Sequence, residues 1–163
     1  MSDLGIKPPW VLPTGHLDPD DAYFNEDHAY DTGSCSYAMC QEAGHYLELT
    51  HSPILCDKIR VFCKHMEADY DEVNPDITVD VYFDGTWHNV ISSVISQSGW
   101  TVIPLQEPKV VSAMRIKFNK VELYGMIGAA CFCVVSDLPS RIREKVQLIK
   151  DACAEIERLV KEQ

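Results

Sequence analysis

The strongest constraint on the fold is a series of short segments in which apolar and polar side chains alternate. Residues 58–64 and 77–83 both show this two-residue period. The period is typical of strands with one face in a core. Asp84-Gly85 follows the second segment and supplies the residue pair that a tight hairpin turn prefers. The sequence therefore predicts a β-hairpin over residues 77–90.

Further strand-like segments occupy much of the chain. Residues 46–50, 99–105 and 114–118 read as extended runs, and Pro104 favours an edge or an end. Residues 127–135 are almost continuously apolar, which indicates a buried strand. Strands and helices do not alternate, so a parallel sheet is not expected. The predicted fold class is all-β: an antiparallel β-sandwich jelly roll with an irregular N-terminal arm and one C-terminal α-helix.

Three segments follow from the changes in composition. Residues 1–24 contain four prolines and are predicted to form the arm, in which residues 10–12 are either a short edge strand or a segment laid on a neighbouring molecule. Residues 25–135 form the predicted sandwich, with a short helical turn within residues 20–31. Residues 136–163 form the predicted amphipathic helix, with a cap at Ser136-Asp137 and Pro139 in its first turn.

The C-terminal segment carries an apolar stripe. Its members recur at alternating steps of four and three residues: Ile142, Val146, Ile149, Cys153, Ile156 and Val160. Such spacing is the a/d pattern of helices that pack side by side. The stripe predicts either a helix packed on its own sandwich or an oligomerisation surface for further copies or other subunits.

Charge limits the partners that can be expected. The 163-residue chain has a formal net charge of -11, and Lys7 and Lys58 bracket a stretch with nine acids and no Lys or Arg. Binding to nucleic acid needs a basic stripe, so it is not predicted. No run approaches about 18 apolar residues, and no membrane span is expected. The first residues lack the features of a secretory signal, which predicts a cytoplasmic location.

The seven cysteines argue against a disulfide framework, because their number is odd and no signal is expected. They are predicted to be buried thiols. A zinc site formed by Cys35, Cys40 and His45 is the alternative.

Catalytic signatures are missing. The sequence has no Gly-x-Ser-x-Gly, His-Glu-x-x-His or phosphate-loop motif. A non-enzymatic protein is therefore predicted. Aromatic side chains in loop-like or terminal positions are the candidate ligand contacts, alongside the alternative of simple packing: Trp10, Tyr23, Phe24, Tyr70 and Trp100.

An acidic loop over residues 26–38 carries oxygen ligands close together. Asp27, Asp31 and Ser36 are the candidate ligands for a calcium ion, which prefers six to eight oxygens. The alternative is a loop held by side-chain hydrogen bonds to its own backbone.

Four motifs together resemble a known family. They are Ala29, Asp31, Ser36 and Ala38 in the acidic loop; Asp84, Gly85 and Trp87 in the hairpin; Met114–Phe118; and Val121–Gly125. Over residues 25–135 the chain resembles the galactose-binding-like jelly rolls of the discoidin, or coagulation factor 5/8 C-terminal, type. The resemblance implies the sandwich fold, a structural calcium near Asp31, and binding of sugars or lipid head groups through loops.

Two functions follow. The preferred one is a structural assembly protein, namely a virion component of decoration, tail or fibre-adaptor type. It would be assembled in the host cytoplasm as a homo-oligomer among other protein subunits. The alternative is a carbohydrate- or ligand-binding module supported by calcium. The proline-rich arm and the striped helix favour the first, because both look like connectors.

Overall fold

The computed structural model describes residues 9–31, 36–135, 149–150, 152–153 and 156. Within the described part of residues 9–135 the chain forms ten strands and one short 3-10 helix, η1 (Glu26–Ala29). The strands are β1 (Trp10–Val11), β2 (Gly15–Leu17), β3 (Tyr23–Phe24), β4 (Ala38–Cys40), β5 (Leu47–Met66), β6 (Glu72–Val73), β7 (Asp76–Phe83), β8 (Thr86–Val94), β9 (Thr101–Phe118) and β10 (Tyr124–Val134). Neighbouring strands pair antiparallel. The all-β prediction is confirmed.

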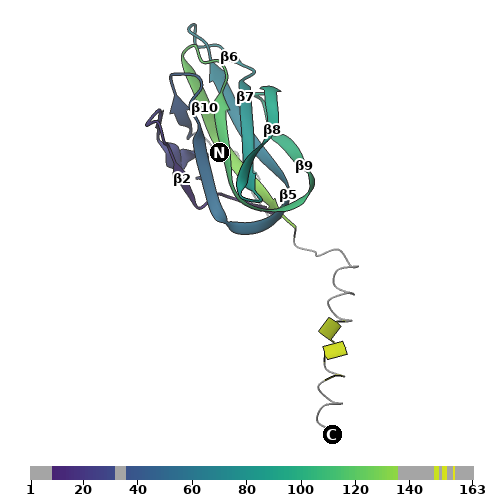
Figure 1. Ribbon diagram of the computed structural model, residues 1–163. Helices are drawn as coiled ribbons and strands as arrows, with labels where there is room; N and C mark the ends of the chain where they lie inside the picture. Colours follow the sequence, from purple (N-terminus) through teal and green to yellow (C-terminus); the bar gives the residue numbers. More distant parts are fainter. Residues whose placement is uncertain (1–8, 32–35, 136–148, 151, 154–155, 157–163) are drawn as a thin grey trace.

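Two long, bent strands connect the layers of the sandwich. The order of pairing is β3-β4-β10-β5-β9-β7-β8. Residues 47–50 of β5 pair with residues 113–116 of β9, whereas residues 58–61 pair with residues 101–104. Each strand therefore runs through both layers and curves between them (Figure 1). The sequence pattern divided each into two strands, because the register shifts at Thr50/Ile54 and Cys56/Lys58 interrupt the alternation.

The core forms where the predicted alternation places it. Ile77, Val79 and Val81 of β7 are fully buried, and so are Ile59 and Val61 of β5. Strand β10 is buried along nearly its whole length, because it lies between β4 and β5. The apolar run at residues 127–135 was thus correctly predicted as a buried strand.

The described part of the N-terminal segment adds strands to the sandwich. β1 pairs with β10, β2 with β5, and β3 with β4. The edge strand predicted at residues 10–12 is confirmed as β1, and the predicted helical turn is η1. Proline breaks the segment into short pieces, but each piece still finds a partner strand.

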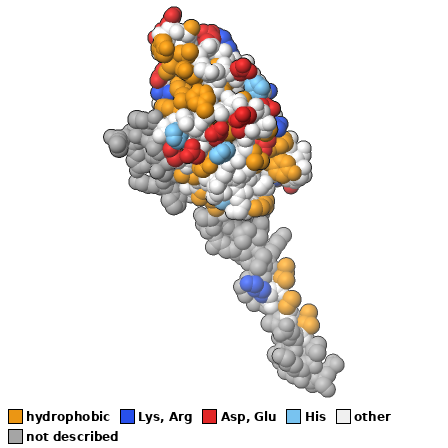
Figure 2. Space-filling model, turned by 90° about the vertical axis from the view of Figure 1, so that its left-hand side faces the viewer, with side chains coloured by type: hydrophobic (Ala, Val, Ile, Leu, Met, Phe, Trp, Pro, Cys, Tyr) orange, Lys and Arg blue, Asp and Glu red, His pale blue; other side chains and the backbone are white. Residues whose placement is uncertain are grey.

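The C-terminal stripe is described at three positions. Ile149, Cys153 and Ile156 are helical and exposed. Described hydrophobic side chains lie along one side of this helix (Figure 2). These three side chains are therefore not packed on the sandwich, whereas Ile142, Val146 and Val160 lie outside the described residues. The oligomerisation surface stays a prediction.

His65 on β5 is a buried histidine with a defined protonation state. It is 2% exposed, and its Nε2 accepts the backbone N–H of Glu122 at 3.1 Å. An accepting Nε2 carries no proton, so the bond requires the neutral ring. Burial lowers the pKa of His65, and the charge of Lys120 lowers it further.

We expect His65 to make the fold less stable in mild acid. Because the pKa of His65 is lower in the fold than its unfolded value of 6.5, the unfolded chain binds the proton first as pH falls. The free energy of unfolding should decrease from about pH 7 downward until the folded pKa is passed. His65→Gln keeps an acceptor and should remove this part of the pH dependence in urea unfolding.

His45 supplies a control of opposite sign. A hydrogen bond with Asp20 raises the pKa of His45, so its contribution to stability is present below pH 6.5 and is lost as pH rises through the folded pKa. His45→Gln should therefore make the acid loss steeper. An unchanged pH profile in His65→Gln would contradict the assignment.

Candidate ligand-binding pocket

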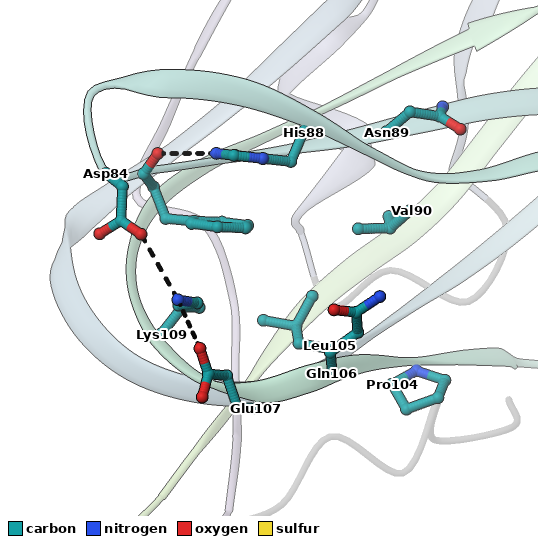
Figure 3. A pocket seen from close by; sticks show the side chains of 10 residues that line it. Asp84, His88, Asn89, Val90, Pro104, Leu105, Gln106, Glu107 and Lys109 are labelled. Atoms are coloured by element: carbon teal, nitrogen blue, oxygen red, sulfur yellow. Dashed lines mark hydrogen bonds and ion pairs between the residues drawn. The ribbon is translucent and has the colours of Figure 1, made fainter.

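A pocket of about 390 Å³ opens where the β7–β8 hairpin turn faces the bend of β9 (Figure 3). This volume lies within the range of small-molecule sites. Asp84 and Gly85 of the turn both have positive φ, 51° and 80°, which the primed hairpin turn requires. The lining residues are Phe83, Asp84, His88, Asn89, Val90, Pro104, Leu105, Gln106, Glu107 and Lys109.

The pocket has an apolar floor. Phe83, Val90 and Leu105 are partly buried and pack against the hydrophobic core. They come from β7, β8 and β9, so the floor is fixed by three strands. A rigid apolar floor beneath polar side chains is the usual composition of a ligand site.

His88 and Phe83 form a parallel ring pair at one side of the pocket. Their ring centroids lie 3.8 Å apart at an interplanar angle of 5°. His88 Nε2 lies 3.2 Å from the Phe83 carbonyl oxygen, which can only accept, so Nε2 donates. In the neutral ring the lone pair is then on Nδ1. The hydrogen bond fixes the orientation of His88 on the rim.

The lysine in this pocket is held by carboxylates. Lys109 Nζ lies 2.7 Å from Glu107 Oε1 and 3.4 Å from Asp84 Oδ2. The same ammonium lies 5.5 Å from the centre of the Phe83 ring. The hydrogen bond with Glu107, and then the charges of Glu107 and Asp84, raise the pKa of Lys109. Lys109 is therefore a charged and already paired group.

Asn89 links the pocket to the outer face of its sheet. Its Nδ2 donates to Asp80 Oδ1 at 2.9 Å and to the Ile91 carbonyl at 3.2 Å. Asp80 Oδ2 accepts Arg115 Nε at 2.8 Å. The guanidinium of Arg115 stacks at 4.1 Å from the centre of the Tyr46 ring and at 4.4 Å from that of Trp87. This network fixes the position of the Asn89 amide on the outer face of the sheet.

A second arginine, Arg60, also lies between two aromatic rings. The guanidinium of Arg60 lies 4.4 Å from the centre of the Trp10 ring and 4.1 Å from that of Trp100. Two of the aromatic residues predicted to contact a ligand are thus brought together, although they are far apart in sequence. Both stack on a buried cation. They lie outside the pocket of Figure 3.

The other three predicted aromatic contacts have different surroundings. Tyr23 is a core residue whose hydroxyl donates to the His45 carbonyl at 3.2 Å. Phe24 packs edge-on against Tyr124, and Tyr70 is 72% exposed at a turn. As a group, the five stay a prediction as ligand contacts.

Tyr23 and Phe24 also border a second, acidic hollow of about 350 Å³, lined by Asp20, Asp21, Ala22, Tyr23, Phe24, Gln41, Glu42 and His45. His45 Nδ1 lies 2.9 Å from Asp20 Oδ2 in this hollow. Acidic and histidine side chains gather on the side of the molecule seen in Figure 2, while Lys and Arg lie towards its margins. The charged residues that line the hollow, Asp20, Asp21 and Glu42, all lie in the stretch without Lys or Arg.

The described residues contain no group of three His, Cys, Asp or Glu side chains that could hold a metal ion. Asp27 and Asp31 lie within and just after η1, where the Asp27 carbonyl accepts the Asp31 N–H at 3.0 Å. Residues 32–35, including Cys35, lie outside the described part. Calcium at Asp27, Asp31 and Ser36 stays a prediction.

The described cysteines are free thiols, five of them buried. Burial raises the pKa of Cys40 and of Cys56 to about 11, so both thiols are protonated near neutral pH. Cys40 lies in the core and His45 Nδ1 is bonded to Asp20, while Cys35 lies outside the described residues, so the zinc site of Cys35, Cys40 and His45 stays a prediction. In the described residues no helix is long and apolar enough to cross a membrane.

Comparison with known proteins identifies the fold. No protein-family model matches the chain, and no curated protein matches it. Three similar solved structures are carbohydrate-binding modules. CBM32-1 of a family 31 glycoside hydrolase from Clostridium perfringens has a TM-score of 0.57 at 13% identity, over 75% of this chain and 96% of that one. The family 32 module of C. perfringens NanJ, in complex with galactose, has a TM-score of 0.55 at 8% identity, over 76% and 93%.

The third structure is the CBM32 of AlyQ in complex with 4,5-unsaturated mannuronic acid. Its TM-score is 0.57 at 9% identity, over 76% of this chain and 96% of that one. At these identities the likeness establishes the fold alone. The chain shares the β-sandwich fold of these modules, which is the fold that the resemblance of the four motifs to galactose-binding-like jelly rolls predicted.

Proposed function

We propose that this protein is a non-catalytic carbohydrate-binding module whose ligand occupies the pocket at the β7–β8 turn. The observation that carries the proposal is the apolar floor beneath a rim of hydrogen-bonding groups. A pyranose ring has the same division, with C–H groups on its faces and hydroxyl groups around its edge. The similar solved modules support the same class of ligand.

The rim offers donors and acceptors suited to hydroxyl groups. Asp84 has carboxylate oxygens that accept, the Gln106 amide both donates and accepts, and His88 has its Nδ1 lone pair. Asn89 uses its amide nitrogen within the fold, so it is not counted among the ligand-binding groups. Carboxylate acceptors make stronger hydrogen bonds than neutral ones.

Binding is tested with the intact chain by calorimetry. Neutral methyl glycosides of galactose, glucose, mannose and N-acetylglucosamine are titrated at about 10 mM, above a millimolar Kd. His88→Ala should weaken binding at least about tenfold, because it removes the ring from the rim and uncovers Phe83. His28→Ala, in η1 and outside the pocket, is the matched control. Absence of binding to every glycoside, or equal affinity of His88→Ala and the unchanged chain, would count against the proposal.

Assembly is a second proposal with a narrower basis. Ile149, Cys153 and Ile156 form the described part of the stripe, and all three are exposed. An unburied a/d stripe suits a partner helix. A place in a virion has no further support from the described residues.

A further inference from the structure

We propose that the pocket selects neutral sugars and discriminates against sugars that carry a carboxylate. This inference rests on the proposed carbohydrate binding and concerns the same site. It depends on three charged residues, Asp84, Glu107 and Lys109.

The lining of the pocket carries a net negative charge. Two carboxylates and one ammonium leave one formal negative charge when His88 is neutral. Lys109 is the one Lys or Arg among the lining residues that the structure describes. This charge has the same sign as the net charge of the chain, which is -11. A bound carboxylate would add like charge to an acidic site.

The ammonium of Lys109 is already paired with two carboxylates. Glu107 Oε1 lies 2.7 Å and Asp84 Oδ2 3.4 Å from Lys109 Nζ, and Figure 3 shows the ammonium between the two acids. An incoming carboxylate would compete with both for the same ammonium. Arginine is the side chain best suited to bidentate recognition of a carboxylate, and none of the described residues that line the pocket is an arginine.

Asp84 and Glu107 can also form hydrogen bonds with a neutral ligand. Asp84 is 70% and Glu107 67% exposed in their side chains, so both still have lone pairs open to solvent. Each can accept hydrogen bonds from sugar hydroxyls. The same two residues therefore attract neutral sugars and screen Lys109 from acidic ones, which makes them specificity-determining residues.

The test uses pairs of sugars that differ in one group. Methyl galactoside is paired with methyl galacturonide, and methyl glucoside with methyl glucuronide, at pH 7.5 and about 20 mM salt, where charges are weakly screened. We expect the unchanged chain to bind the neutral member at least about tenfold more tightly than its acid. In Asp84→Asn/Glu107→Gln, which frees Lys109, this ratio should fall below about threefold or invert. Asn suits position 84 because it tolerates positive φ.

The control is Glu122→Gln, which removes one carboxylate outside the pocket and should leave the ratio unchanged. No binding of any sugar would overturn the proposed function and this inference together. Equal binding of the two members, or a preference for the acid, by the unchanged chain would overturn the inference alone. A neutral preference that persists in the double variant would do the same, because it would place the selectivity elsewhere.

Discussion

Asp80→Ala is expected to lower the free energy of unfolding by about 3 kcal/mol. The carboxylate is 5% exposed and accepts from Arg115 Nε at 2.8 Å and from Asn89 Nδ2 at 2.9 Å. Removing it leaves Arg115 without its anion between Tyr46 and Trp87. The loss of a partner from a buried pair costs far more than the pair contributes net.

The pH dependence of this effect has a definite sign. Burial by itself would raise the pKa of Asp80, but hydrogen bonds from Asn89, Arg115 and Tyr46 outweigh it and lower the pKa below 3.8. A carboxyl with a lowered pKa contributes stability above its unfolded pKa and loses it as pH falls through the folded one. The difference between Asp80→Ala and the unchanged chain should therefore shrink below about pH 4.

Urea unfolding at pH 7 measures the change, with an unchanged m-value as the sign that the unfolded state is the same. Glu107→Ala is the matched control, because its carboxylate is exposed and should change stability by less than about 0.5 kcal/mol. A loss below about 1 kcal/mol in Asp80→Ala would show that the network contributes little. Asp80→Ala/Arg115→Met should recover part of the loss, because no charge is then left unpaired.

Gly125→Ala is expected to cost about 2–3 kcal/mol by overpacking. A Cβ at this position would stand 2.6 Å from two ring carbons of Phe118, which is fully buried. The backbone cannot easily move away, because Gly125 pairs with Cys40 on one side and with His65 on the other. The glycine therefore exists for close packing rather than for a special backbone angle.

Two further variants make the Gly125 prediction specific. Gly99→Ala is the control, since nothing lies within 4 Å of its Cβ, and it should stay within about 0.5 kcal/mol. Adding Phe118→Leu to Gly125→Ala should cost less than the sum of the two single changes, because the smaller side chain makes room for the methyl group. Additive losses in thermal or urea unfolding would contradict the steric account.

Local patterns predicted the elements that depend on neighbouring residues. The β7–β8 hairpin was predicted because Asp84-Gly85 specifies the turn and the flanking strands alternate. The full length of β5 was not predicted, because residues 54–56 pair with residues 109–111 of β9 between two register shifts and show no period of their own. Continuity of a bent strand depends on its partner, which a local window does not contain.

The pocket shows the same limit. Phe83 and His88 flank the predicted turn, so their nearness was implicit in the hairpin. Leu105 and Lys109 reach them only because β9 bends after Pro104, and that bend is a tertiary feature. The aromatic candidates were chosen for loop-like positions, and Trp10 and Trp100 instead proved to share one arginine.

A neutral sugar bound in the pocket at the β7–β8 turn should perturb the backbone of the residues that line this pocket. Amide chemical shifts of the 15N-labelled chain, followed during titration with the tightest-binding neutral methyl glycoside, test it most directly. If the sugar binds in this pocket, the amide chemical-shift changes should be concentrated in residues 83–90 and 104–109. Shifts centred instead on Trp10 and Trp100, or on the acidic hollow at His45, would contradict it, and so would a spectrum that does not change.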